Sequence, residues 1–110
     1  MKIIAQSKEF TKMELYALTE SPDVRRMKDA VGQELPLVNW LEYEQTGNDG
    51  EDRTILAIET EDHEVYATAS ESFIRQFHRA ADVLGDEFKN IKIFEGTSKA
   101  GRQFMQCAAK

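Results

Sequence analysis

Apolar and polar residues alternate along three stretches in the middle of the chain. The alternation covers Glu34–Gln45, Arg53–Thr60 and Val65–Ala69, and a period of two is typical of β-strands. Polar segments of the kind that form turns separate the three stretches. The sequence therefore predicts three consecutive strands that pair antiparallel, the first of them long enough to bend.

The pattern changes to a helical period after Ser70. Apolar residues then recur at the spacing of an amphipathic helix, which we expect Ser70 to cap and Gly85 to end. Alternation returns from Ile91 to Phe94 and over Gln103–Ala109, with a glycine-containing turn between them. One helix and two further strands therefore follow the three-stranded meander.

The N-terminal segment carries two helix-start signals. Thr11–Glu14 has the Thr-x-x-Glu form of a capping box, and Ser21–Asp23 combines a capping Ser with Pro and Asp. We therefore expect short helices in residues 1–32, ahead of a strand-rich segment at 33–110. At 110 residues, the chain is expected to form a single domain.

The order of these elements predicts a mainly β fold. Three meandering strands, one helix and a two-stranded hairpin are the elements of the OB-fold, a five-stranded Greek-key barrel. A long first strand suits this barrel because it must pair on both edges to close the sheet. We therefore predict an OB-fold-like five-stranded antiparallel barrel, with one helix between strands three and four and short N-terminal helices.

Composition narrows the class of protein. The chain has 20 acidic and 14 basic residues and a net charge of −6, which argues against a generally basic surface that coats nucleic acid. Residues 31–85 contain twelve of the acids and three of the bases, so an anionic ligand must be bound by locally placed bases. No apolar run approaches the roughly 20 residues of a membrane span, and the N-terminus lacks the form of a secretion signal. We therefore expect a cytoplasmic location. Cys107 is the only cysteine, so we expect no intrachain disulfide.

No residue pattern indicates catalysis. The sequence offers no convincing pair of nucleophile and base, no paired carboxylates and no ligand cluster. Asp62, His63 and Glu64 would point in divergent directions, so they are interpreted as a solvated turn rather than a metal site. His78 lies beside the apolar face of the predicted helix and is expected to be exposed. We therefore predict that the protein is not an enzyme and uses no metal or cofactor.

The glycine-containing turn near the C-terminus is the most informative polar segment. Thr97 and Ser98 offer hydroxyl groups there, and Lys99 and Arg102 offer positive charge, a combination that binds phosphate. A turn of similar composition can also serve structure alone. In an OB-fold, however, this loop and the first hairpin loop, close to Arg53, border the face that binds oligonucleotides. We therefore predict DNA contacts from all five residues.

Aromatic side chains on the predicted strands are candidates for base stacking, which is worth roughly 1–3 kcal/mol per base. We select Trp40, Tyr43 and Tyr66, because Trp40 is expected to be partly exposed and a tyrosine can present its ring with a solvated hydroxyl. Phe94 and Phe104 are assigned to the core. The predicted site therefore combines three stacking residues with the basic turn.

Several of these segments together resemble a known family. Thr54–Ile58, Glu64–Ser70 and above all Ile91–Phe104, with Gly-Thr-Ser-Lys followed by a second Gly and an aromatic residue, carry the resemblance. They resemble the small single-stranded-DNA-binding replication proteins of bacteriophages and prophages of Gram-positive bacteria, over roughly residues 34–109. The resemblance implies cooperative, sequence-tolerant coating of single strands in a bacterial host cell, without cofactor or catalysis.

Two functions compete on this reading of the sequence. We predict a single-stranded-DNA-binding protein of phage-type DNA replication or recombination, with replication proteins and further copies of the chain as additional candidate partners. The alternative is an OB-like protein-interaction module that docks a replication or host protein through acidic hairpins and has little affinity for nucleic acid. A second basic cluster, Arg25, Arg26 and Lys28, is interpreted as a solvated helix face, with phosphate contact as the alternative.

Overall fold

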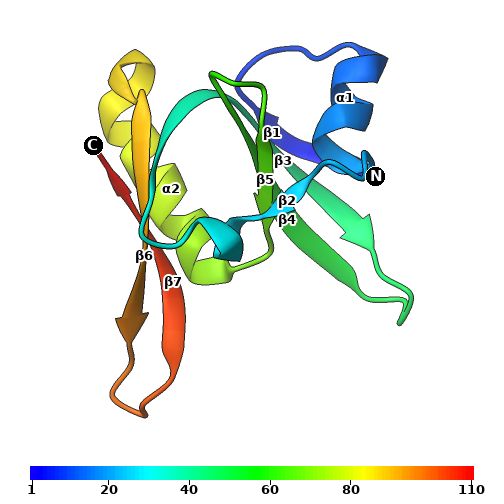
Figure 1. Ribbon diagram of the computed structural model, residues 1–110. Helices are drawn as coiled ribbons and strands as arrows, with labels where there is room; N and C mark the ends of the chain where they lie inside the picture. Colours follow the sequence, from blue (N-terminus) through cyan, green and yellow to red (C-terminus); the bar gives the residue numbers. More distant parts are fainter.

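The computed structural model describes residues 1 to 110 as two α-helices, two short 3-10 helices and seven strands (Figure 1). In chain order the elements are β1 (Lys2–Gln6), α1 (Lys12–Thr19), β2 (Arg25–Arg26), η1 (Met27–Ala30), β3 (Glu34–Thr46), β4 (Asp52–Thr60), β5 (Val65–Thr68), α2 (Glu71–Leu84), η2 (Gly85–Glu87), β6 (Asn90–Thr97) and β7 (Gln103–Ala109). None of the helices is long and apolar enough to cross a membrane.

The long strand β3 organises the sheet. One edge of β3 pairs with β4 from Leu37 to Thr46, and the other edge pairs with β1 and, at Glu34–Pro36, with β6. An irregularity at Val38, between Leu37 and Asn39, bends the strand between its two sets of partners. The hydrogen-bonded order is β2-β5-β4-β3-β6-β7, with β1 beside β3. A long first strand with partners on both edges is therefore present.

The mainly β class is confirmed, whereas the predicted number of strands is wrong. The sheet has seven strands instead of five, because β1 joins β3 and β2 joins the free edge of β5. β2 runs parallel to β5 and all other pairs are antiparallel, so the sheet is mixed. Figure 1 shows it as a curled sheet, with α2 between the β6–β7 hairpin and the remaining strands.

The N-terminal segment is helical only in part. Thr11 caps α1 as predicted: its hydroxyl accepts the Glu14 N–H at 3.1 Å, and the Glu14 carboxylate accepts the Thr11 N–H at 2.9 Å. The helix predicted after Ser21 is wrong. The Ser21 hydroxyl instead accepts the Asp23 N–H in a local turn, and β2 then pairs with β5. Pairing with a sheet edge outweighs the local helix signal at this position.

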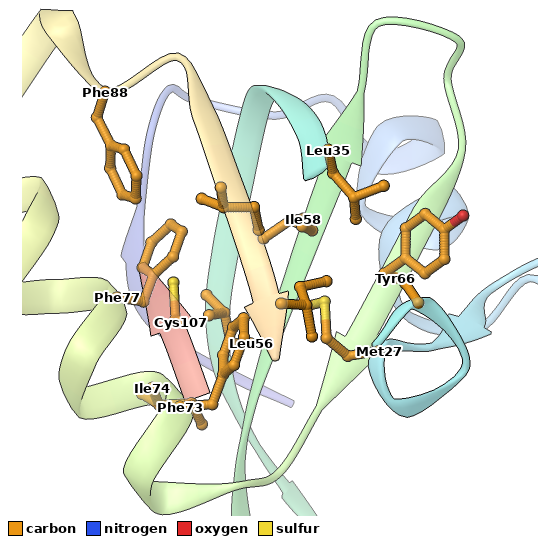
Figure 2. Packing of buried hydrophobic residues seen from close by; sticks show 13 residues of the cluster. Met27, Leu35, Leu56, Ile58, Tyr66, Phe73, Ile74, Phe77, Phe88 and Cys107 are labelled. Carbon is orange, nitrogen blue, oxygen red and sulfur yellow. The ribbon is translucent and has the colours of Figure 1, made fainter. Parts of the chain in front are cut away.

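The larger apolar cluster lies between α2 and the sheet and contains 13 buried residues (Figure 2). Ser70 begins α2 by accepting the Phe73 N–H, and Gly85 ends it with a φ of +54°. Phe73 and Phe77 have no exposed surface, and the Phe77 ring lies 5.1 Å from that of Phe88. Burial of side chains of this size stabilises the folded state by roughly 1.5–3 kcal/mol each.

A smaller cluster lies on the other face of the sheet, under α1. Leu56 and Ile58 of β4 belong to the larger cluster, whereas Ala57 between them belongs to the smaller one, as alternation along a strand requires. Leu18 of α1 is buried against this face together with Tyr43 of β3. α1 therefore covers the outer face of β3, β4 and β5 around Tyr43.

Candidate nucleic-acid interface

The β6–β7 hairpin has two different faces. Ile91, Ile93 and Cys107 are buried in the larger cluster and define its inner face. By strand alternation, Phe94 and Phe104 lie on the outer face, where both are half-buried and belong to neither apolar cluster. They come from adjacent strands at diagonal positions of the ladder, which brings large side chains within reach of each other. The outer face is therefore aromatic.

Three cations surround this aromatic face. Lys92 shares the outer face of β6 with Phe94, and Lys99 and Arg102 are exposed at the turn. None of the three forms an ion pair with a carboxylate. Residues 90–110 contain four basic residues and one acidic residue, in a protein whose net charge is −6. The hairpin is therefore a local positive region in which Lys99 and Arg102 are available to an anion, while Lys92 lies opposite Glu34 in the β3–β6 ladder.

Local hydrogen bonds fix the turn between β6 and β7. The Ser98 N–H donates to the Arg102 C=O at 2.8 Å, and the Gly101 N–H donates to the Ser98 C=O at 2.9 Å. The Arg102 N–H donates to the Ser98 hydroxyl at 3.2 Å. Gly101 has a φ of +81°, a conformation that favours glycine. The turn therefore brings four of the predicted site residues, Thr97, Ser98, Lys99 and Arg102, to one tip.

The structure does not bring Arg53 to this tip. Arg53 lies in the β3–β4 hairpin, which points away from the β6–β7 hairpin in Figure 1. Its guanidinium donates to the Asp49 carboxylate at 2.9 Å. A hydrogen bond from the Glu51 N–H, together with Arg53, lowers the pKa of the Asp49 carboxyl and keeps it ionised. Asp49, Glu51 and Asp52 are exposed around this turn, and Arg53 is the only basic residue in residues 34–60, so the tip of this hairpin presents an acidic surface.

Two of the three aromatic residues selected for stacking lie inside the molecule. Tyr43 has 3% of its surface exposed and Tyr66 has 6%, and burial raises the pKa of both phenols. The Tyr66 hydroxyl donates to Glu64 Oε2 at 2.8 Å, and the Arg25 guanidinium lies 5.9 Å from the centre of its ring. Neither tyrosine has a free ring face to offer to a base.

The third, Trp40, is half-buried against α2. Its ring meets Phe77 edge-on, with 5.5 Å between ring centres and 74° between the planes, and lies 5.9 Å from His78. His78 is half-buried rather than exposed, and its Nε2 lies 2.9 Å from Oε1 of Glu42, which has 7% of its surface exposed. These contacts join α2 to β3, which gives Trp40 and His78 a structural role.

The second basic cluster is largely neutralised. Arg25 pairs with Glu64 at 3.3 Å, and Arg26 pairs with Asp29 at 3.2 Å. Lys28 forms no ion pair. His63 lies 3.5 Å from Glu59, and no group of three or more His, Cys, Asp or Glu side chains is placed to hold a metal ion. Of these residues, Lys28 alone remains available for an anion.

Sequence reasoning missed Phe94 and Phe104 by assigning both to the core. The alternation along β6 is the signal that identifies the outer face. Ile91 and Ile93 point to the core, so Phe94, which follows Ile93, points to the opposite face. The face that carries Lys92 is the more polar one, and Phe94 shares it. A lysine and a phenylalanine at alternate positions of an edge hairpin therefore indicate an outer face rather than a core.

The chain matches no protein-family model, no curated protein and no solved structure.

Proposed function

We propose that the chain binds single-stranded DNA on the outer face of the β6–β7 hairpin. The observation that carries the proposal is the position of Phe94 and Phe104 on one face, with Lys92, Lys99 and Arg102 around them and free of carboxylate partners. Proteins that bind single strands combine aromatic side chains for the bases with a positive track for the backbone. This hairpin supplies both on one surface.

The net charge favours unpaired bases as the ligand. With a net charge of −6, neutralisation of phosphates by the few bases of the hairpin contributes a limited share of the binding energy. Stacking adds roughly 1–3 kcal/mol per base and is available only where the bases are unpaired. Duplex DNA of the same length should therefore bind more weakly than a single strand.

We also propose that the sheet is an opened OB-type barrel, which supports DNA binding on the β6–β7 hairpin. The strands β3, β4 and β5, the helix α2 and the β6–β7 hairpin follow the OB order, with β3 paired on both edges. β2 occupies the edge of β5, and neither strand is hydrogen-bonded to β7, so the sheet is open between β2 and β7. OB-folds bind oligonucleotides over strands two and three and the adjoining loops. Here α1 covers the equivalent face, which leaves the last hairpin as the binding surface.

The resemblance of residues 91–104 to phage single-stranded-DNA-binding proteins supports a role in phage-type DNA replication or recombination in the cytoplasm of a bacterial host. Binding and coating of a strand require no cofactor and no catalytic group. The protein would then bind DNA without changing it chemically, and replication proteins would be further partners.

A protein-interaction role is the second candidate function. The β3–β4 hairpin favours it, because the exposed Asp49, Glu51 and Asp52 and a single neutralised Arg53 form a surface suited to a basic protein partner. In that case the OB-like sheet would dock a replication or host protein and have little affinity for nucleic acid. A measurement of DNA binding by the β6–β7 hairpin decides between the two functions.

Fluorescence anisotropy at low salt tests the proposal, with labelled oligo-dT and a duplex of the same length. We expect tighter binding of the single strand by about tenfold or more, since each stacked base adds roughly 1–3 kcal/mol. Phe94→Ala and Phe104→Ala should each lower the affinity for oligo-dT by roughly fivefold or more, for the same reason. Tyr16→Ala is the matched control, because Tyr16 is an exposed aromatic residue on α1 and should not contribute.

Circular dichroism of each variant confirms that the fold is retained. Equal affinity for single strands and duplex contradicts the proposal, as does the absence of binding to either at low salt. A loss of affinity in Tyr16→Ala as large as in the two phenylalanine variants would move the site to α1.

A further inference from the structure

A pocket lies where the sheet is open, between the end of β5 and β7. Its volume is about 590 Å³, within the range of about 300–1,000 Å³ that is typical of small-ligand sites. The residues that line it come from three segments: Lys28 and Val31 before β3, Thr68 and Ser70 at the end of β5, and Glu95, Gln103, Phe104 and Met105 in the β6–β7 hairpin. The pocket therefore adjoins the proposed DNA-binding hairpin on its inner side.

The β7 edge at this pocket offers backbone groups to a ligand. The Met105 C=O accepts the Ser72 hydroxyl at 3.1 Å, and the Cys107 N–H donates to the Gln76 amide oxygen at 2.7 Å. The odd-numbered residues of β7 therefore direct their backbone groups away from β6. By the alternation of an antiparallel ladder, the N–H and C=O of Gln103 point the same way. Side chains of α2 occupy the backbone groups of Met105 and Cys107, so the groups of Gln103 are the ones that face a ligand in the pocket.

The pocket is lined by apolar side chains and by polar side chains that form no ion pair. Val31, Phe104 and Met105 are half-buried and supply the apolar surface. Lys28 and Glu95 carry opposite charges, yet neither forms an ion pair with the other or with a third residue. Gln103 adds an amide that both donates and accepts. Apolar walls, a polar rim and one cation match a nucleobase with its attached phosphate.

We propose that this pocket binds one unpaired guanine base of the single strand, an inference that rests on the proposed function. A glutamate carboxylate such as that of Glu95 has two acceptor oxygens and no donor. The Watson–Crick edge of guanine presents two adjacent donors, the ring N1–H and the amino group, so one carboxylate accepts from both. Thymine presents one N–H between two carbonyl oxygens, which face a carboxylate unfavourably. Lys28 binds the neighbouring phosphate.

Competition between short oligonucleotides tests this inference. We would use strands of about six nucleotides, within the ~4–16 nucleotides that one OB-type domain occupies. One strand contains only thymine and the other contains a single central guanine. The wild-type protein should prefer the guanine strand by about tenfold, the size of a bidentate base contact. Glu95→Gln should abolish this preference, because the amide presents one acceptor instead of two.

Using the ratio of the two affinities removes the general effect of charge, because loss of a carboxylate raises the affinity for both strands alike. Glu61→Gln, which removes an exposed carboxylate from the β4–β5 turn, is the matched control and should keep the preference. Free GMP should compete far more weakly than the guanine strand, since it lacks the contacts to the hairpin.

The outcomes separate the inference from the function on which it rests. Equal affinity of the wild-type protein for both strands overturns the guanine pocket but leaves DNA binding intact, and so does an unchanged ratio in Glu95→Gln. Absence of binding to either strand overturns the proposed function as well. Binding of free GMP as tight as that of the guanine strand overturns the assignment to a base within DNA.

Discussion

The ring of Phe104 lies against Gly96, the residue directly opposite it in the β6–β7 ladder. A Cβ atom at Gly96 would be 3.1 Å from Cζ of Phe104 and would overlap the Gln106 amide. Carbon atoms in contact are normally about 3.5–4.0 Å apart. Glycine at this position therefore leaves the room that the aromatic ring occupies on the outer face of the hairpin.

Replacement of Gly96 should weaken DNA binding without unfolding the protein. Gly96→Ala places a methyl group where the Phe104 ring and the Gln106 amide now lie, so both side chains must move. We expect a loss of affinity for oligo-dT of roughly fivefold, close to that of losing one stacked base. Fluorescence anisotropy measures the affinity, and circular dichroism checks the fold.

Gly50→Ala is the control for a general weakening of a hairpin. Gly50 lies in the β3–β4 turn with a φ of +79°, and a Cβ there meets no other atom within 4 Å. The substitution strains the backbone and displaces no side chain. If Gly96→Ala and Gly50→Ala lowered the affinity equally, the position of the Phe104 ring would not be the cause.

Much of the fold follows from local signals in the sequence. The long alternating stretch after Glu34, the cap at Ser70 and the helix stop at Gly85 each occur where the structure has the corresponding element. Thr11 and Glu14 likewise form the capping box that their spacing predicts. These features depend on residues close in sequence, which is why pattern alone identifies them.

The remaining features depend on contacts between distant segments. β1 forms because β3 has a free edge beside Leu41–Glu44, and β2 forms because β5 has a free edge, neither of which the N-terminal sequence reveals. The exposure of the candidate site residues also depends on contacts between distant segments. Trp40 is covered by Phe77 of α2, whereas nothing buries Phe94 in either apolar cluster, and only the packing of the elements distinguishes the two rings.

The basic tip of the hairpin should account for much of the salt dependence. Replacement of both Lys99 and Arg102 by Ala removes two unpaired cations from one exposed turn. The slope of log K against log salt should flatten by about 1.4, at roughly 0.7 per phosphate contact on a single strand. Titrations of oligo-dT at several salt concentrations measure the slope.

Lys2 and Lys12 provide the comparison for this double variant. Both are exposed and unpaired, and they lie on β1 and α1. Their replacement by Ala should change the slope far less. An unchanged slope in the Lys99 and Arg102 variant would move the phosphate contacts elsewhere, with Lys92 and Lys28 as the next unpaired candidates.

Trp40 should matter for stability rather than for binding. Trp40→Ala removes the ring that packs against Phe77 and His78, and we expect a loss of about 3 kcal/mol in the free energy of unfolding, in line with other large-to-small changes. Trp40→Phe should recover most of this loss. Urea unfolding measures the free energy of unfolding of both variants. The affinity for oligo-dT should stay unchanged in both variants, and a folded Trp40→Ala protein that binds weakly would show that Trp40 stacks on a base.

Cys107 should make the protein less stable at alkaline pH. Burial raises the pKa of its thiol to about 12, so the folded state keeps the proton that the unfolded chain releases near a pH of about 8.5. The stabilisation is complete below the lower value and is lost as the pH rises toward the higher one. Tyr43 and Tyr66 also have raised phenol pKa values, so the contribution of Cys107 must be isolated by difference.

Urea unfolding of the wild-type protein and of Cys107→Ala at pH values of about 7 and about 10 provides this difference. Between these values the wild-type protein should lose about 2 kcal/mol more than the variant, since each pH unit above the unfolded pKa costs about 1.4 kcal/mol. The same burial should make the native thiol react slowly with a thiol reagent at alkaline pH and rapidly once urea is added. An equal pH dependence in both proteins, together with fast native labelling, would mean that the β7 strand opens and exposes Cys107 in the folded state.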